Sequence, residues 1–338
     1  MYSPEKALTQ TENAPAQAEI EAASQWVGAL RGALHEVIIG QEELLHGLTI
    51  GLLTGGHVLL EGVPGLAKSL AVSSLAGAVH GSFNRIQFTP DLLPSDLVGT
   101  EIYNVKEGTF SIRKGPLFAN FVLADEVNRA PAKVQSALLE SMQERQVSIG
   151  GETFDLPSPF LVLATQNPLE QEGTYPLPEA QLDRFALKLL VHYPSKDEEL
   201  AVLDLMASTQ PTPQIRPVIS LDQIREGRAL VDKVALDPRL RQYIIDLVFA
   251  TRFPAQVGLK ELVGRIHYGA SPRASIWLAL AARANAFLEG RGFVTPTDIK
   301  RVAHDVLRHR VIGTYEADAE GLTSDKLVAR VLETVPVP

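Results

Sequence analysis

The sequence contains no cysteine, and this absence excludes both a disulfide framework and any metal site with thiolate ligands. It also lacks an apolar run of membrane-spanning length. The most apolar late stretch, SIWLALAARANAFLE, is interrupted by Arg283 well short of the roughly 18 to 20 residues that a span requires. We therefore expect no membrane insertion.

An excess of positive charge is missing as well. The chain has 31 basic and 40 acidic residues, which give a net charge of -9. This balance opposes a sequence-independent interaction with the phosphates of nucleic acid or with an anionic membrane surface. We expect no nucleic acid among the partners.

The length and composition are those of a globular protein. At 338 residues, 45% of them apolar, the chain is long enough for two domains. Its N-terminus has acidic residues and no apolar core of the kind that a signal peptide needs. We predict that residues 1–20 form a flexible tail and that the protein is cytoplasmic.

Short apolar runs alternate with helical patterns between residues 21 and 194. HVLLEG precedes KSLAVSSLAGAV, FVLADE precedes PAKVQSALLESMQE, and FLVLATQ precedes further apolar sequence in ALKLLVHY. The runs are continuously apolar rather than alternating, as in central strands that are covered on both faces. This pattern indicates an α/β core with a mostly parallel sheet flanked by helices.

The character of the sequence changes after Tyr193. Ser195 and Glu198 have the spacing of a capping box, and the apolar spacing beyond them is helical, with no convincing strand. We predict that residues 195–338 form a small all-α domain.

Two insertions interrupt the α/β domain. Residues 102–115 have a glycine at their centre, and residues 146–156 place Gly150 and Gly151 between alternating apolar residues, which suits a two-residue hairpin turn. Both insertions are predicted to be hairpins. The aromatic side chains of Tyr103 and Phe110 can pack within the first hairpin.

The stretch EGVPGLAKS, residues 61–69, resembles a phosphate-binding loop, but Ala67 stands where the usual pattern has glycine. A helix begins at this point, so we expect a right-handed conformation that alanine tolerates. In such loops the backbone N–H groups and a lysine bind phosphate, and a hydroxyl completes a magnesium site. The alternative is a glycine-rich turn with an exposed lysine. The predicted binding residues are Gly62, Val63, Pro64, Gly65, Leu66, Ala67, Lys68, Ser69 and Leu70.

Polar side chains follow two further apolar runs. FVLADE delivers Asp125 and Glu126 together, and FLVLATQNP ends in Gln166 and Asn167. One carboxylate at such a position can hold magnesium while the next activates a water molecule. We assign magnesium to Asp125 and water activation to Glu126. The alternative is that the acids only favour the start of the next helix.

Together, GVPGLAKS, FVLADEVNRAP, ATQNP, EAQLDRF and SPRAS resemble the MoxR family of AAA+ ATPases, whose usual loop is similar to the Ala67 form. The resemblance covers roughly residues 25 to 335. It implies a P-loop AAA+ core over residues 21–194, a helical lid over residues 195–338, and ATP with Mg²⁺ as cofactors.

The resemblance implies that the two hairpins face the ring pore or a partner, where Tyr103 and Phe110 would grip a substrate instead of only packing within the hairpin.

The resemblance also implies roles for other individual residues. Ser69 and Asp125 would hold magnesium, and Asp125 with Glu126 would be the Walker B pair. Asn167 would be sensor 1, and Arg129 would face the subunit interface. Further implied roles are the arginine finger for Arg184, which would otherwise form an ion pair with an acid such as Asp183, sensor 2 for Arg273, and adenine contacts for Val37 and Ile38.

The activity implied by the resemblance is chaperone-like. It is ATP hydrolysis by a homo-oligomeric, hexameric ring that remodels a client protein complex or inserts a metal cofactor, together with a partner that carries a von Willebrand factor A domain. Two alternatives remain at this point. One is the motor subunit of a metal chelatase, and the other is a nucleotide-gated scaffold with little turnover.

Overall fold

The computed structural model describes residues 17–168, 173–208 and 215–338. Residues 1–16 of the predicted tail lie outside this part of the chain, and helix α2 (Gln17–His35) begins before the predicted end of the tail. The chain forms two compact units. One consists of residues 28–185 and 189–222, and the other includes residues 186–188 and 223–338.

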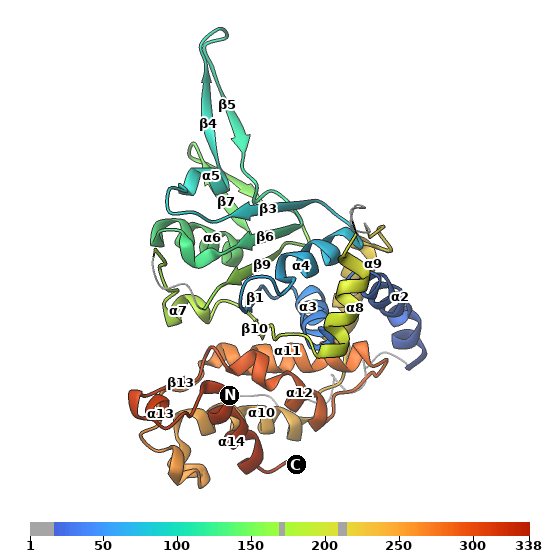
Figure 1. Cartoon of the computed structure of the whole chain (residues 1–338), viewed down its shortest axis with the longest axis vertical. Helices are drawn as coiled ribbons and strands as arrows, with labels where there is room; N and C mark the ends of the chain where they lie inside the picture. The colour runs from blue at the N-terminus through green and yellow to red at the C-terminus, as the bar shows by residue number, and fades with distance from the viewer. Residues whose placement is uncertain (1–16, 169–172, 209–214) are drawn as a thin grey trace, which may run out of the picture. The chain divides into compact units, whose positions relative to one another are not determined.

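A five-stranded sheet forms the centre of the first unit (Figure 1), with strand order β10-β1-β9-β6-β3. The pairs β1–β9, β9–β6 and β6–β3 are all parallel. The predicted α/β class is confirmed, and so are the three strands expected from continuous apolar runs, which are β1, β6 and β9. The strands of the sheet are β1 (Val58–Glu61), β3 (Phe83–Gln87), β6 (Phe121–Asp125), β9 (Leu161–Gln166) and β10 (Leu187–Leu190).

Helices cover both faces of this sheet, which is why its central strands are apolar throughout. Val122, Ala124 and Val162 belong to a buried cluster that also contains Leu138 of α6 (Ala132–Glu144). On the other face, α4 (Lys68–Gly77) packs against β6, β9 and β3. The remaining elements around the sheet are α3 (Glu42–Thr54), β2 (Val79–His80), α5 (Pro94–Val98), η1 (Val127–Arg129), α7 (Glu179–Leu182), α8 (Lys196–Met206) and β11 (Ile219–Ser220).

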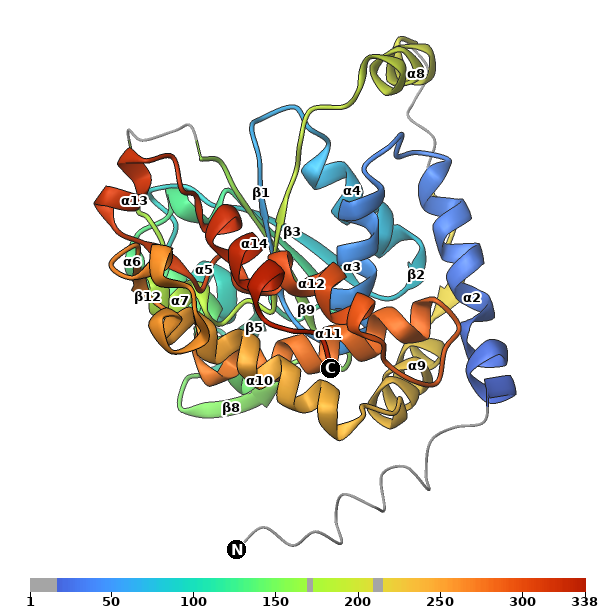
Figure 2. The same ribbon diagram turned by 90° about the horizontal axis from the view of Figure 1, so that it is seen from below.

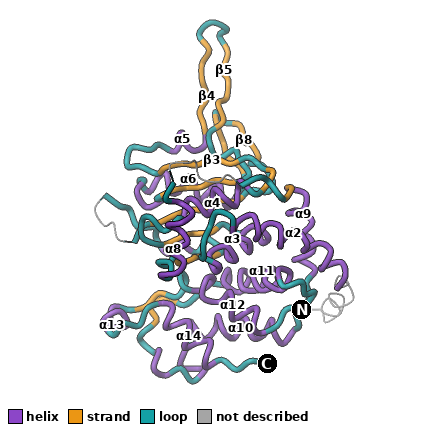
Figure 3. The backbone as a smooth tube through the Cα atoms, turned by 45° about the vertical axis from the view of Figure 1, so that its right-hand side comes forward, coloured by secondary structure: helices purple, strands orange, loops and turns teal. Residues whose placement is uncertain are grey.

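Both predicted hairpins are confirmed. Strands β4 (Gly99–Asn104) and β5 (Thr109–Lys114) pair antiparallel and project away from the sheet, as Figures 1 and 3 show. Strands β7 (Gln146–Ile149) and β8 (Glu152–Asp155) pair across Gly150 and Gly151, whose φ angles of 60° and 86° suit the tight turn.

The second unit is mainly helical. Helix α11 packs against both α10 and α12, and the three lie side by side in Figure 2. A short antiparallel pair, β12 with β13, was not predicted, because strands this short carry no measurable periodicity. The elements of the second unit are α9 (Leu221–Lys233), α10 (Pro238–Arg252), η2 (Pro254–Val257), η3 (Lys260–Leu262), β12 (Ile266–Tyr268), α11 (Pro272–Leu288), α12 (Pro296–Leu307), β13 (Ile312–Gly313), α13 (Tyr315–Ala319) and α14 (Ser324–Thr334).

The domain boundary at residue 194 stays a prediction. Ser195 caps α8 with Glu198 in the expected capping box, yet this helix belongs to the compact unit that contains the sheet. Among the helices of the described ranges, none is long and apolar enough to cross a bilayer.

A buried carboxylate organises the start of α12. Asp298 accepts hydrogen bonds from Arg291 Nη2 at 2.5 Å, Asn285 Nδ2 at 2.6 Å and Thr295 N at 2.6 Å. Burial alone would raise the pKa of this carboxyl, but the hydrogen bonds from Arg291, Thr295 and Asn285 hold it below its ordinary value. The charged form therefore stabilises the fold above the unfolded-state pKa, and this stabilisation is lost as the pH falls through the folded-state pKa.

Asp298→Asn should destabilise the helical unit by roughly 2 to 4 kcal/mol at neutral pH, because it leaves the Arg291 guanidinium without its charged partner. Circular dichroism during urea unfolding measures the loss, which should shrink as the pH is lowered. The control is Glu333→Gln, which breaks an exposed pair with Arg330 and should have little effect. Equal effects of the two substitutions would contradict this account.

Candidate functional site

The loop between β1 and α4 has an unusual backbone. Gly65 has a φ of 86°, and Ala67, directly before the helix, has a φ of 56° and a ψ of 21°. The expectation of a right-handed Ala67 is therefore wrong. The residue that ends the loop must turn the chain into α4 through the left-handed region, where a Cβ atom is crowded by the backbone. Alanine is compatible with this loop at a cost in free energy.

Ala67→Gly should raise the free energy of unfolding by up to about 1 kcal/mol, because the Ala67 side chain is exposed and its methyl group only strains the backbone. The matched control is Ala229→Gly, at an exposed position within α9, which should lower the free energy of unfolding by about 1 kcal/mol. Denaturant unfolding measures both. Equal losses from the two substitutions would mean that Ala67 is right-handed after all.

Lys68 lies in the first turn of α4. Its ammonium donates to the backbone oxygens of Gly62 and Val63, the latter at 2.8 Å. Burial lowers the pKa of this ammonium, while the charges of Asp125 and Glu126 act in the opposite direction. A partly buried cation with two neutral carbonyl acceptors suits an anionic ligand, so the loop fits a phosphate group.

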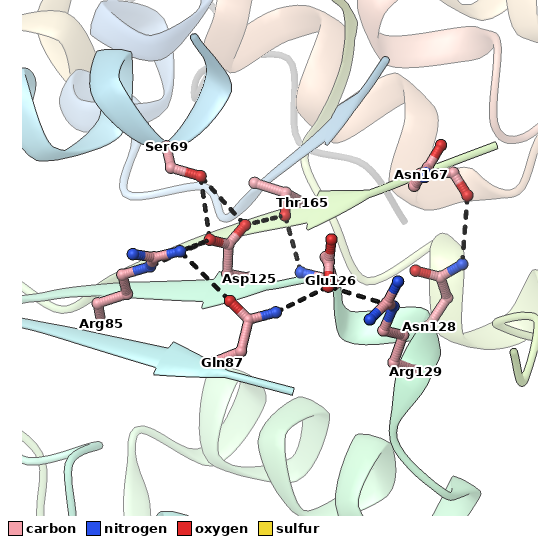
Figure 4. A network of polar contacts seen from close by, with 9 residues as sticks. All are labelled: Ser69, Arg85, Gln87, Asp125, Glu126, Asn128, Arg129, Thr165 and Asn167. Atoms are coloured by element: carbon pink, nitrogen blue, oxygen red, sulfur yellow. Dashed lines mark hydrogen bonds and ion pairs between the residues drawn. The ribbon is translucent and has the colours of Figure 1, made fainter. Parts of the chain in front are cut away.

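Asp125, at the end of β6, is the centre of a polar network (Figure 4). Ser69 Oγ donates to its carboxylate at 3.0 and 3.2 Å, and Thr165 Oγ1 donates at 2.6 Å. Arg85 of β3 donates to Oδ2 through Nε at 3.1 Å and Nη2 at 2.6 Å. The hydroxyl and carboxylate that were assigned to magnesium thus lie together, and hard oxygen ligands of this kind fit that ion.

Glu126 follows with a left-handed backbone, at a φ of 57°. Its N–H donates to Thr165 Oγ1 at 2.8 Å, which couples its backbone to the same threonine that contacts Asp125. Its Oε2 accepts from Gln87 Nε2 at 2.8 Å and pairs with Arg129 Nε at 3.2 Å. The Glu126 side chain is therefore held at the sheet edge rather than extended into solvent.

Asn167 lies just after β9 and is buried. Its backbone oxygen accepts from Asn128 Nδ2 at 3.4 Å, while Asn128 Oδ1 is buried without a hydrogen-bond partner among the described residues.

One pocket of about 390 Å³ lies between the loop before α4 and the carboxyl ends of the strands. It is lined by residues 64–70 together with Arg85, Gln87, Asp125, Glu126, Thr165, Gln166 and Asn167.

Comparisons with known proteins agree with this geometry. Residues 57–187 match the family described as "ATPase family associated with various cellular activities (AAA)", and residues 264–331 match the "AAA lid domain". Chaperone MoxR1 of Mycobacterium tuberculosis is 50% identical over 315 residues, which cover 92% of this chain and 83% of that protein. The chain belongs to the MoxR family of AAA+ ATPases.

Other relatives support the assignment. Protein YeaC of Bacillus subtilis is 45% identical over 90% of this chain and 92% of its own. A crystal structure of a protein from Cytophaga hutchinsonii is 51% identical, with a TM-score of 0.89 over 95% of this chain and 97% of that one. The predicted family, the P-loop core and the helical lid of a MoxR protein are thus confirmed.

The remaining residues predicted for the MoxR site lie elsewhere. Val37 and Ile38 are buried in the segment between α2 and α3, and they do not line the pocket formed by described residues. Arg184 follows α7 and is half-buried, and its guanidinium forms no hydrogen bond or ion pair with another described residue, so the alternative pair with Asp183 is not seen. Arg273 lies in the second unit, where its N–H donates to the capping Ser271 Oγ at 3.2 Å.

Several residues of the network were not predicted from the sequence. Arg85 and Gln87 lie on β3, where they alternate with the buried Ile86 and Phe88. This alternation of polar and apolar residues is the sequence pattern that predicts an edge strand with polar side chains on one face. Thr165 precedes the predicted sensor by two positions and is almost fully buried. Arg129, expected at a subunit interface, contacts Glu126 of its own chain.

Proposed function

We propose that this MoxR protein is a magnesium-dependent ATPase that binds ATP in the pocket between the phosphate loop and the carboxyl edge of the sheet. The observation that carries the proposal is the contact of Ser69 with Asp125, because it unites a loop hydroxyl and a strand-end carboxylate next to Lys68. The bound ion would neutralise charge on the phosphates.

Phosphate binding, ion binding and water activation would each be carried out by different residues of the chain. Backbone N–H groups of the loop and the Lys68 ammonium would bind the phosphates, while Ser69 and Asp125 would hold the ion. Glu126 would orient the attacking water and accept its proton. Asn167 would position that water or the terminal phosphate from the next strand.

Glu126→Gln should keep the affinity for ATP but lower hydrolysis by roughly two orders of magnitude or more, because the amide cannot accept the proton. Nucleotide binding and phosphate release should both be measured. The matched control is Glu140→Gln on the exposed side of α6, which should leave both unchanged. Undiminished hydrolysis in Glu126→Gln would remove this residue as the base.

We further propose a ring of six subunits in which Arg184 completes the site of a neighbouring subunit. The half-buried guanidinium without a partner in its own described chain supports this role, because a desolvated cation needs an anion. Arg273 would sense the nucleotide from the lid, and Val37 with Ile38 would contact adenine. Hydrolysis rates per subunit should then rise with protein concentration and saturate.

Arg184→Ala and Glu126→Gln should each be inactive alone but regain hydrolysis when mixed. In a mixed ring, some interfaces combine an intact Glu126 from one subunit with an intact Arg184 from the next. Steady-state phosphate release of the mixture measures this recovery. A mixture as inactive as its components would contradict a contribution between subunits, provided that size-exclusion chromatography shows mixed assemblies.

We infer the cellular role of this chain from its relatives. One of them is described as a chaperone, and we propose that this chain also remodels client protein complexes, together with a partner that carries a von Willebrand factor A domain. The exposed side chains of Tyr103 and Phe110, whose ring centroids lie 4.9 Å apart on the projecting hairpin, offer an apolar contact for such a client. They pack against each other as well, so both interpretations of this pair are compatible with the structure.

A further inference from the structure

The proposed function gives no role to the guanidinium of Arg85. Arg85 Nε and Nη2 donate to Asp125 Oδ2 at 3.1 and 2.6 Å, so a fixed positive charge contacts the carboxylate that is assigned to Mg²⁺. Two cations at one carboxylate repel each other. This contact therefore opposes binding of the ion instead of supporting it.

The carboxylate has no spare acceptor capacity. A carboxylate offers about four lone-pair sites. At Asp125 these are used by two Arg85 nitrogens, by Thr165 Oγ1 at 2.6 Å and by Ser69 Oγ at 3.0 and 3.2 Å. A metal ion, or a water molecule bound to it, must displace one of these donors.

Exposure shows which donor can leave. Thr165 is 1% exposed and also accepts from the Glu126 N–H, so its displacement would disturb the base as well. Ser69 is itself expected to bind the ion. The Arg85 side chain is 56% exposed at the edge strand, and its charge can be solvated when it moves.

We propose that Arg85 is a positioning residue that neutralises Asp125 until magnesium takes over the carboxylate. The inference rests on the proposed function, since it concerns the same magnesium site. Arg85 lowers the affinity for the ion because its contacts must be broken first. It also prevents an uncompensated Asp125 from repelling nucleotide phosphates when magnesium is scarce.

The network extends this exchange to the predicted base. Arg85 Nη2 also donates to Gln87 Oε1 at 3.3 Å, and Gln87 Nε2 donates to Glu126 Oε2 at 2.8 Å. Release of Arg85 from Asp125 therefore loosens the residue that holds the Glu126 side chain. Figure 4 shows these contacts leading from Asp125 through Arg85 and Gln87 to Glu126. Metal binding at Asp125 would therefore change how firmly the side chain of the base is held.

Arg85→Gln should strengthen the binding of magnesium and weaken the binding of nucleotide in the absence of magnesium. With a fluorescent, non-hydrolysable ATP analogue, the magnesium concentration that gives half-maximal enhancement of binding should fall, on the order of tenfold, because no cation must be displaced. In EDTA, the affinity for the same analogue should fall, since Asp125 then repels the phosphates. Damage to the fold would weaken both forms of binding and could not produce this pair of changes.

Matched variants sharpen the test. Arg85→Lys keeps the charge, so the magnesium requirement and the affinity in EDTA should both lie closer to the wild-type values than in Arg85→Gln. Arg113→Gln on the exposed β5 strand removes an equal charge and should change neither quantity. In an Asp125→Asn background, Arg85→Gln should no longer change the magnesium requirement, because the two residues act through one contact.

The outcomes separate this inference from the proposed function. A wild-type protein that responds to magnesium, together with unchanged constants in Arg85→Gln or constants that weaken together, would overturn the role of Arg85 alone. Wild-type binding that does not respond to magnesium would contradict the magnesium-dependent site itself, and the inference with it.

Discussion

The hydrogen bonds accepted by the Asp125 carboxylate connect three elements of the site to β6. Ser69 reaches it from the phosphate-loop helix, Thr165 from β9 and Arg85 from β3, so one buried charge fixes three separate elements relative to β6. A buried carboxylate is costly unless its acceptors are satisfied. The need to satisfy this buried carboxylate therefore organises the candidate site.

The sheet makes this convergence possible. Its strands β1, β9, β6 and β3 are parallel, so their carboxyl ends meet at one edge. The apolar interiors of β1, β6 and β9 are buried between helices, and the polar side chains of these strands lie at their carboxyl ends. Left-handed backbones at Ala67 and Glu126 then turn the chain within the site, and local strain is accepted where function requires the geometry.

Elements with a long or strictly local signal could be predicted from the sequence. Continuous apolar runs gave β1, β6 and β9, the capping pattern gave the start of α8 at Ser195, and Gly150 with Gly151 gave the turn between β7 and β8. Strand β3 was not predicted because a half-exposed edge strand has no apolar run, and β12 and β13 were not predicted because they are too short to show a period. The conformation of Ala67 was misjudged because helix propensity says nothing about the turn that enters the helix.

The sequence by itself determined the fold class and the family, and it pointed to the loop before α4, Asp125 and Glu126 as candidate site residues, since these signals depend on neighbouring residues along the chain. Only the tertiary structure decided which distant residues meet them. Arg85 lies 40 positions from Asp125, as does Thr165 on the other side, and hydrogen bonding across strands brings them together. A contact of this kind depends on strand order and register, which no local pattern of residues encodes.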